Sequence, residues 1–178
     1  MSEPELYLVS YRHFKSEPFK SITQLSEDEA FALAKKLYEN SSCPAHKRFG
    51  PDFAQYYPHR LMTEKWLYER FKALGGKPQT EHPYYFAFHH CENLYTNFDS
   101  GVVTKIKLSD IDISDVSFTF GDSIAQMNRQ SNPEPFLKDK LIKYISEFDH
   151  HVESFLESVI PRYVCIEAQL WTDQYFGM

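Results

Sequence analysis

The sequence has no excess of basic residues. Its 178 residues include 19 Lys and Arg against 25 Asp and Glu, which gives a formal net charge of −6. Proteins that bind nucleic acid over a broad face normally carry a basic excess, because much of their affinity comes from phosphate contacts. The composition therefore argues against such a face, but it is compatible with a local basic pocket or a small anionic ligand.

Cysteine is scarce and long apolar runs are missing. The three cysteines, Cys43, Cys91 and Cys165, are odd in number and widely spaced, so they do not show the pattern of a disulfide framework. We therefore expect a reducing, cytoplasmic environment. No run approaches ~18 apolar residues, so no membrane span is expected. The first ten residues also lack the features of a signal peptide.

Phosphate-binding loops are missing as well. No glycine-rich loop follows any expected strand, which excludes Rossmann-type and Walker-type sites. The segment GGKP at 75–78 follows a predicted helix instead of preceding one, so it indicates a helix end. The segment GDS at 121–123 lacks the second glycine of a nucleophile elbow. We interpret Gly121 and Asp122 as a turn, and the segment is either a simple turn or a loop from which Ser123 and Gln126 can contact a ligand.

Aromatic residues, in contrast, are plentiful at 16% of the chain, and hydrophobic residues make up 42%. A chain of this length can bury roughly two-thirds of its unfolded surface and typically forms one domain. The expected order of elements is strand, two helices, three strands, helix, strand. This order predicts a single α+β domain over 1–178, with a mixed or antiparallel sheet and about three helices. The first and last strands are expected to share that sheet.

Strands are indicated by aromatic and β-branched residues, and helices by apolar spacing and caps. A capping box of Ser26 and Glu29 begins the first helix, and a second helix over 59–74 ends at two glycines. The strand-like segments are 6–11, 83–88, 102–108, 115–120 and 162–171.

Prolines and turn residues mark the expected loops. The segment 41–58 contains three prolines and is expected to be a loop, as is 121–135. The segment 136–159 has helical spacing and forms either one helix or two helices broken near Asp149. We expect Pro161 to end it.

Potential metal ligands gather at three places: Cys43 with His46, the segment 89–92 and the segment 150–153. A structural zinc site typically takes four ligands from two close pairs. No C-x-x-C pair occurs, and adjacent histidines in a strand point to opposite sides. We therefore expect no metal site.

The segment YYPHR at 56–60 combines aromatic and basic side chains. Tyr57, His59 and Arg60 can stack on and clamp an anionic or nucleotide ligand, or they can anchor the long loop that precedes the second helix. The sequence leaves both alternatives open.

The last expected strand, RYVCIEAQLW, has an acid at its centre. Side chains alternate between the two faces of a strand, so Val164, Ile166, Ala168 and Leu170 share an apolar face. The opposite face is mixed, and its members are Tyr163, Cys165, Glu167, Gln169 and Trp171. This face is either exposed to solvent, with Glu167 paired to a Lys or Arg, or it is the wall of a pocket.

Two resemblances rest on these segments. The stretch EKWLYERFKALGGKPQTEHPYYFAF, together with DVSFTFGDS and IEAQLW, resembles a group of uncharacterised prokaryotic hypothetical proteins. It covers roughly residues 60–171 and implies no chemistry. The second is one of layout: a first strand LYLVS, a strand ending in SFTFGDSIAQ, a helix, and a last strand with a glutamate are similar to the DNA-targeting ADP-ribosyltransferase toxins and their relatives.

The second resemblance implies a role for Glu167. In that superfamily a glutamate on a late strand polarises the ribose of NAD and activates the acceptor, and Glu167 is the matching position, with Gln169 on the same face. A carboxylate there can stabilise an oxocarbenium-like state. A His or Arg on the first strand often holds the cofactor in such enzymes. The matching position here is Leu8, while Arg12 and His13 come at the strand's end.

These observations give two hypotheses. In the first, the protein is an ADP-ribosyltransferase-like domain of prokaryotic or phage origin that acts on NAD, with Glu167 and Gln169 in the catalytic site. The expected cofactor contacts are Arg12, His13, Tyr57, Arg60, Tyr163, Trp171 and Ser123. In the second, it is a non-catalytic adaptor whose aromatic surface binds a protein or nucleotide partner. An enzyme requires Glu167 in a concave site near a basic group, whereas an adaptor would show a flat aromatic patch and an exposed Glu167.

Overall fold

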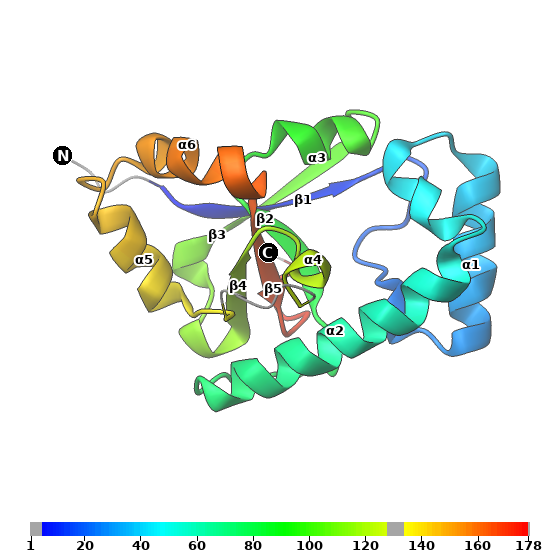
Figure 1. Ribbon diagram of the computed structural model, residues 1–178, viewed down its shortest axis with the longest axis horizontal. Coiled ribbons are helices and arrows are strands. Elements are labelled where there is room, and N and C mark those ends of the chain that lie inside the picture. Colours follow the sequence, from blue (N-terminus) through cyan, green and yellow to red (C-terminus); the bar gives the residue numbers. More distant parts are fainter. Residues whose placement is uncertain (1–4, 128–133, 178) are drawn as a thin grey trace.

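A five-stranded antiparallel sheet organises the chain (Figure 1). The computed structural model describes residues 5–127 and 134–177. The strand order is β3-β1-β2-β5-β4, and each pair of neighbouring strands is antiparallel. The strands are β1 (Tyr7–Arg12), β2 (Tyr84–Phe88), β3 (Val102–Lys107), β4 (Val116–Phe120) and β5 (Ile166–Leu170). The predicted α+β class is confirmed, and the first and last strands do share one sheet.

Helices surround this sheet and exceed the expected three. The α-helices of the described chain are α1 (Glu27–Asn40), α2 (Phe53–Ala73), α3 (Glu92–Asn97), α4 (Ser123–Met127), α5 (Lys138–Ser146) and α6 (Val152–Tyr163). Short 3-10 helices are η1 (Ile22–Gln24), η2 (Pro44–Phe49), η3 (Leu108–Asp110) and η4 (Ile113–Asp115). Among the helices of the described residues, none is long and apolar enough to cross a membrane.

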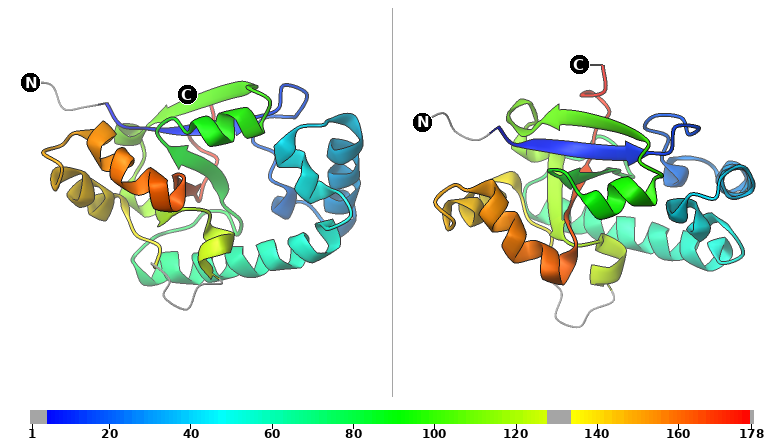
Figure 2. Two further views of the ribbon diagram at one scale, coloured as in Figure 1. Left: turned by 45° about the horizontal axis from the view of Figure 1, so that its top comes forward. Right: turned by 90° about the horizontal axis from the view of Figure 1, so that it is seen from above.

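The two faces of the sheet are covered by different helices. Helices α5 and α6 pack on one face and form the largest apolar cluster with alternate strand residues such as Leu8, Phe88 and Ile166. The opposite face meets α3 near Val9 and Ala87 and the C-terminal half of α2 near Trp171. Figures 1 and 2 show α2 extending past the sheet to α1, which packs on its N-terminal half. A hollow is left between this helical extension and the sheet.

The segment 41–58 is not the loop that its prolines predict. It contains η2, and α2 already begins at Phe53, with Pro58 inside the helix. Phe53 and Tyr57 bury their rings against α1, whereas Pro58 lies on the exposed side of the helix. The backbone hydrogen bond that a proline removes therefore falls near the helix start, on the side facing solvent. Packing of the buried side outweighs the proline signal.

The boundary between α6 and the last strand also differs from the prediction. Helix α6 continues through Pro161 to Tyr163, and β5 begins only at Ile166. Val164 has a φ of 69° and a ψ of −46° and forms the centre of a tight turn closed by the hydrogen bond from the Cys165 amide to the Tyr163 carbonyl oxygen at 2.8 Å, and its side chain is exposed. The expected membership of Val164 in the core face is thus wrong, because the chain turns at this residue instead of running straight.

The structure also decides the predictions for the segments 136–159 and 121–135. The segment 136–159 forms two helices, and the break contains Asp149 and His150, both with positive φ. The turn and loop expected over 121–135 includes the short helix α4 at its start. The part of that segment over 128–133 lies outside the described residues.

Candidate functional site

One face of β5 carries two polar side chains, Glu167, which is partly buried, and Gln169. Glu167 pairs in register with Thr119 of β4 and Ala87 of β2, and Gln169 pairs with Ser117 and Tyr85. Gln169 is fully buried. Its Nε2 donates to Glu167 Oε1 at 2.9 Å and to Thr119 Oγ1 at 3.0 Å, and its Oε1 accepts from Ser117 Oγ at 2.8 Å. This chain of hydrogen bonds fixes the orientation of the Glu167 carboxylate.

Arg60 of α2 faces Glu167 from across the hollow. It lies on the buried stripe of α2 and is 6% exposed. Its Nη1 donates to Ser123 Oγ at 3.3 Å, and its Nη2 lies 3.6 Å from Asp122 Oδ1. The backbone N–H of Ser123 in turn donates to Glu167 Oε1 at 3.4 Å. Ser123 thereby bridges the guanidinium and the carboxylate.

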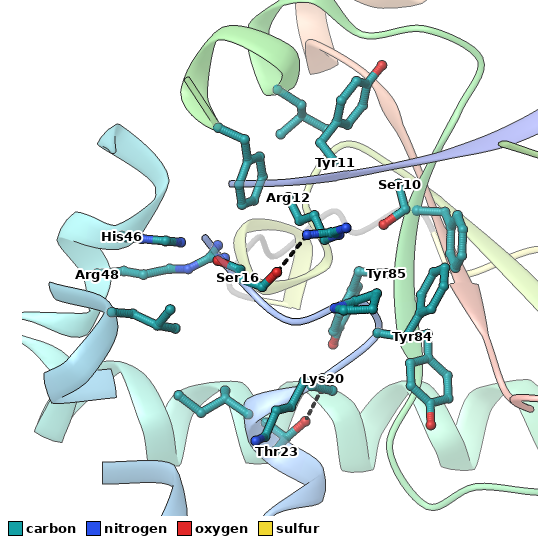
Figure 3. A pocket seen from close by; sticks show the side chains of 18 of the residues that line it. Ser10, Tyr11, Arg12, Ser16, Lys20, Thr23, His46, Arg48, Tyr84 and Tyr85 are labelled. Carbon is teal, nitrogen blue, oxygen red and sulfur yellow. Dashed lines mark hydrogen bonds between the residues drawn. The ribbon is translucent and has the colours of Figure 1, made fainter. Parts of the chain in front are cut away.

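Glu167 and Arg60 line a pocket of about 310 Å³ between the sheet, the segment 16–23 and helices α1, η2 and α2. Figure 3 shows Arg12 extending from β1 into the middle of this pocket, with His46 and Arg48 pointing towards it from the η2 side. Tyr85 enters from β2. The remaining wall is largely aromatic and includes Phe19, Phe49, Tyr56, Tyr84 and Phe98. Concave sites of this kind, apolar with a few convergent polar groups, are typical of small-molecule binding.

The environment of Glu167 changes its acidity. Burial, and secondarily the negative charge of Asp122, raises the pKa of its carboxyl group to about 7, although Arg60, Ser123 and Gln169 act in the opposite direction. A carboxyl group with this pKa can either accept or donate a proton at neutral pH. The arrangement therefore meets the requirement of a concave site with a basic group near the acid.

A second buried carboxylate, Glu64, lies one turn after Arg60 on α2 and is completely buried. It accepts hydrogen bonds from Tyr85 Oη at 2.8 Å and Thr23 Oγ1 at 3.1 Å, and His82 Nδ1 lies 2.7 Å from its other oxygen. The hydrogen bond to Glu64 raises the pKa of His82. The ring of Tyr85 lies beneath the guanidinium of Arg60, 4.8 Å away. Tyr85 thus links the two charged side chains of the helix.

The structure separates the predicted contact residues into two groups. Arg12, Arg60 and Glu167 line the pocket, and Ser123 and Gln169 support Glu167 directly. The other predicted contacts do not line the pocket: Tyr57 packs in the cluster between α1 and α2, His13 pairs with Asp99, Tyr163 packs on Phe120, and Trp171 is fully buried against Phe71.

Sequence reasoning did not identify Glu64, Asp122, Tyr85, His46 and Arg48 as site residues. A signal for one of them was present. Arg60 and Glu64 occupy the same helical stripe as Leu67 and Phe71, and charges on an apolar stripe cost stability unless they are paired and hydrogen-bonded, which indicates a polar cluster at this place. The other four residues reach the site through contacts between segments that are far apart in the sequence.

The histidines and cysteines of the candidate metal sites lie as follows in the structure. Within residues 5–127 and 134–177, no three His, Cys, Asp or Glu side chains are grouped so that they could hold a metal ion. All three cysteines are free thiols. Cys165 lines the pocket, and its interaction with Cys91 lowers the pKa of the Cys91 thiol.

Comparison with known proteins gives no match to a family model, to a curated protein or to a solved structure. Both resemblances seen in the sequence therefore stay predictions. The functional argument rests on the pocket itself.

Proposed function

We propose that the protein is an enzyme that binds NAD or a related nucleotide in the pocket and cleaves its glycosidic bond with the help of Glu167. The observation that carries this proposal is the placement of Glu167 on the pocket wall, hydrogen-bonded by Gln169 and the Ser123 amide and close to the Arg60 cation. Perturbed acids in clefts are frequent catalytic groups.

The chemistry follows from charge. When the bond between ribose C1′ and the nicotinamide nitrogen breaks, its electron pair goes to that nitrogen and the sugar acquires positive charge. An ionised Glu167 stabilises that charge. The acceptor, which is water or a hydroxyl-bearing or nitrogen-bearing group, then bonds to C1′ and gives its proton to Glu167. A pKa near 7 suits this role at neutral pH.

The lining of the pocket supports a nucleotide as the ligand. Aromatic side chains such as Tyr84 and Tyr85 offer surfaces for a base or a nicotinamide ring, and the guanidiniums of Arg12 and Arg48 offer partners for phosphates. We retain the cytoplasm as the proposed location because Cys43, Cys91 and Cys165 are unpaired with one another by disulfides.

The test is to incubate the purified protein with NAD, with and without nucleic-acid or protein acceptors, and to measure nicotinamide release. We expect turnover by the wild-type protein and a loss of about 100-fold or more in Glu167→Gln, because this change removes the negative charge and keeps the shape. Glu157→Gln, at an exposed position of α6, is the matched control and should retain full turnover.

Absence of nicotinamide release from the wild type, or equal rates in wild type and Glu167→Gln, would contradict the proposal. The alternative, a binding domain without catalysis, would then be favoured if NAD or another nucleotide still bound at the pocket without being consumed.

A further inference from the structure

Three buried polar atoms around the pocket have no hydrogen-bond partner among the described residues. They are Arg12 Nε, Ser16 Oγ and His46 Nδ1, and all three residues line the pocket. One further atom of this kind, His89 Nε2, belongs to a residue outside the pocket lining. Buried polar groups in native proteins are nearly always hydrogen-bonded. Their concentration at one pocket therefore points to a ligand that supplies the missing partners.

The donor and acceptor roles of these atoms restrict the ligand. His46 is 3% exposed, and its Nδ1 has no hydrogen-bond partner. Burial lowers the pKa of His46, which favours the neutral ring. A neutral ring carries its proton on one of its two nitrogens, so Nδ1 is either a donor or an acceptor. A hydroxyl group of the ligand can pair with Nδ1 in both cases, because a hydroxyl both donates and accepts.

The neighbouring guanidinium groups of Arg12 and Arg48 only donate hydrogen bonds, so they need an acceptor on the ligand. Arg12 uses Nη1 to donate to the carbonyl oxygen of Ser16 at 2.6 Å, and its Nε is left free. Arg48 stacks over the rings of Phe49 and Tyr56. Within the described part of the chain, neither Arg12 nor Arg48 has a carboxylate within 4.0 Å. Two guanidiniums without a carboxylate partner at one pocket are suited to an anion.

We propose that Arg12, Ser16, His46 and Arg48 form a subsite for a sugar phosphate, in which the guanidiniums bind the phosphate and His46 Nδ1 forms a hydrogen bond with a sugar hydroxyl. This proposal rests on the proposed function and deepens it, because it assigns the pocket end near η2 to the phosphoribosyl part of the nucleotide and leaves the Glu167 end for the reacting bond.

The subsite can be tested by binding alone, without turnover. The probes are ribose 5-phosphate, ribose, and sulfate, which is an anion without a hydroxyl donor, titrated into the full-length protein and followed by NMR chemical shifts. We expect ribose 5-phosphate to bind about tenfold or more tightly than ribose. Arg48→Gln should weaken both ribose 5-phosphate and sulfate about tenfold, whereas Lys35→Gln, an exposed cation of α1 paired with Glu39, should change neither.

His46→Phe separates the contact to the sugar hydroxyl from the contacts to the phosphate, because it keeps a ring and removes the hydrogen-bonding nitrogen. It should weaken ribose 5-phosphate several-fold and leave sulfate binding unchanged. Ser16→Ala provides a second, smaller change and should also weaken ribose 5-phosphate. Thermal unfolding of each variant checks that it is folded.

Equal affinity for ribose and ribose 5-phosphate, or wild-type affinity in Arg48→Gln, would overturn the subsite. A loss of ribose 5-phosphate and sulfate binding by equal factors in His46→Phe would overturn the role of His46. None of these titrations requires turnover. Failure of NAD cleavage with these binding results intact would therefore count against the proposed reaction and not against the subsite.

Discussion

Burial of the Glu167 carboxylate in the central sheet links its ionisation to the stability of the fold. The pKa of this group is about 7 in the folded protein, against an ordinary value of 4.5. Between these two values the folded state binds more protons than the unfolded state, so the free energy of unfolding falls as the pH rises through this window. The full effect of such a shift is on the order of 3 kcal/mol.

Glu167→Gln should remove this pH dependence. We expect the variant to gain about 1–3 kcal/mol of stability relative to the wild type between pH 5 and pH 8, because glutamine carries no charge at either pH. Urea unfolding at both pH values measures the difference. Glu157→Gln, the exposed control, should keep the same offset from the wild type at both, and parallel behaviour of the two variants would contradict the interpretation.

Residue patterns predicted the part of the site that lies on one strand and missed the part that tertiary packing brings together. The alternation along β5 indicated that Glu167 and Gln169 share a face, because successive side chains of a strand point to opposite faces. The register with β2 and β4 agrees with this placement. The cluster around Glu64 joins residues 18 and 21 positions apart, and His46 reaches the pocket only because η2 packs beside α1. Such proximity comes from tertiary packing, which no local pattern in one sequence encodes.

At the level of elements, the strands and the caps followed their sequence signals more closely than the ends near prolines. The capping box is present, with Ser26 Oγ accepting from the Glu29 amide and Glu29 accepting from the Ser26 amide. Pro58 and Pro161 both lie inside helices, each with its ring on an exposed side. Proline is a reliable stop signal only when the helix gains little by continuing, and here Tyr57 and Val159 gain burial.

The turn between α3 and β3 offers an element-scale prediction. A Cβ added at Gly101 would lie 2.3 Å from the backbone oxygen of Arg12 and 2.9 Å from that of Phe98. Gly101→Ala should therefore displace the end of β1 and destabilise the protein by about 1–3 kcal/mol. Because Arg12 ends that strand, ribose 5-phosphate binding should weaken as well.

Thermal unfolding and the NMR titration measure the two effects of Gly101→Ala. Gly177→Ala is the control, because nothing lies within 4 Å of its added Cβ. An unchanged melting temperature in Gly101→Ala would show that the β1 end accommodates the methyl group.

At the scale of the whole molecule, the C-terminal segment secures the loop that closes the pocket. Phe176 stacks on Phe19 with ring centroids 3.9 Å apart and an angle of 7° between the planes, and it meets Tyr84 edge-on at 4.6 Å. Phe19 and Tyr84 both line the pocket. The segment 16–23 is thus held in place by a residue from the other end of the chain.

Phe176→Ala should loosen this contact. We expect a loss of about 1–3 kcal/mol in stability and faster proteolytic cleavage within residues 14–20, because the stacked ring no longer restrains the loop. Limited proteolysis followed by mass spectrometry locates the cleavage. Phe14→Ala, at a ring that is 63% exposed, should leave stability nearly unchanged, and equal cleavage rates in the two variants would argue against the anchoring role.

The position of β5 also has a consequence for biosynthesis. This strand is translated last, yet it lies between β2 and β4, and it is the only strand with which β4 forms a ladder in the described chain. A nascent chain can pair β3, β1 and β2. The edges of β2 and β4 that β5 later covers stay open until β5 leaves the ribosome, and open strand edges favour aggregation. Glu167 arrives with that same strand. The protein therefore cannot acquire its proposed activity before β5 has been made and has left the ribosome.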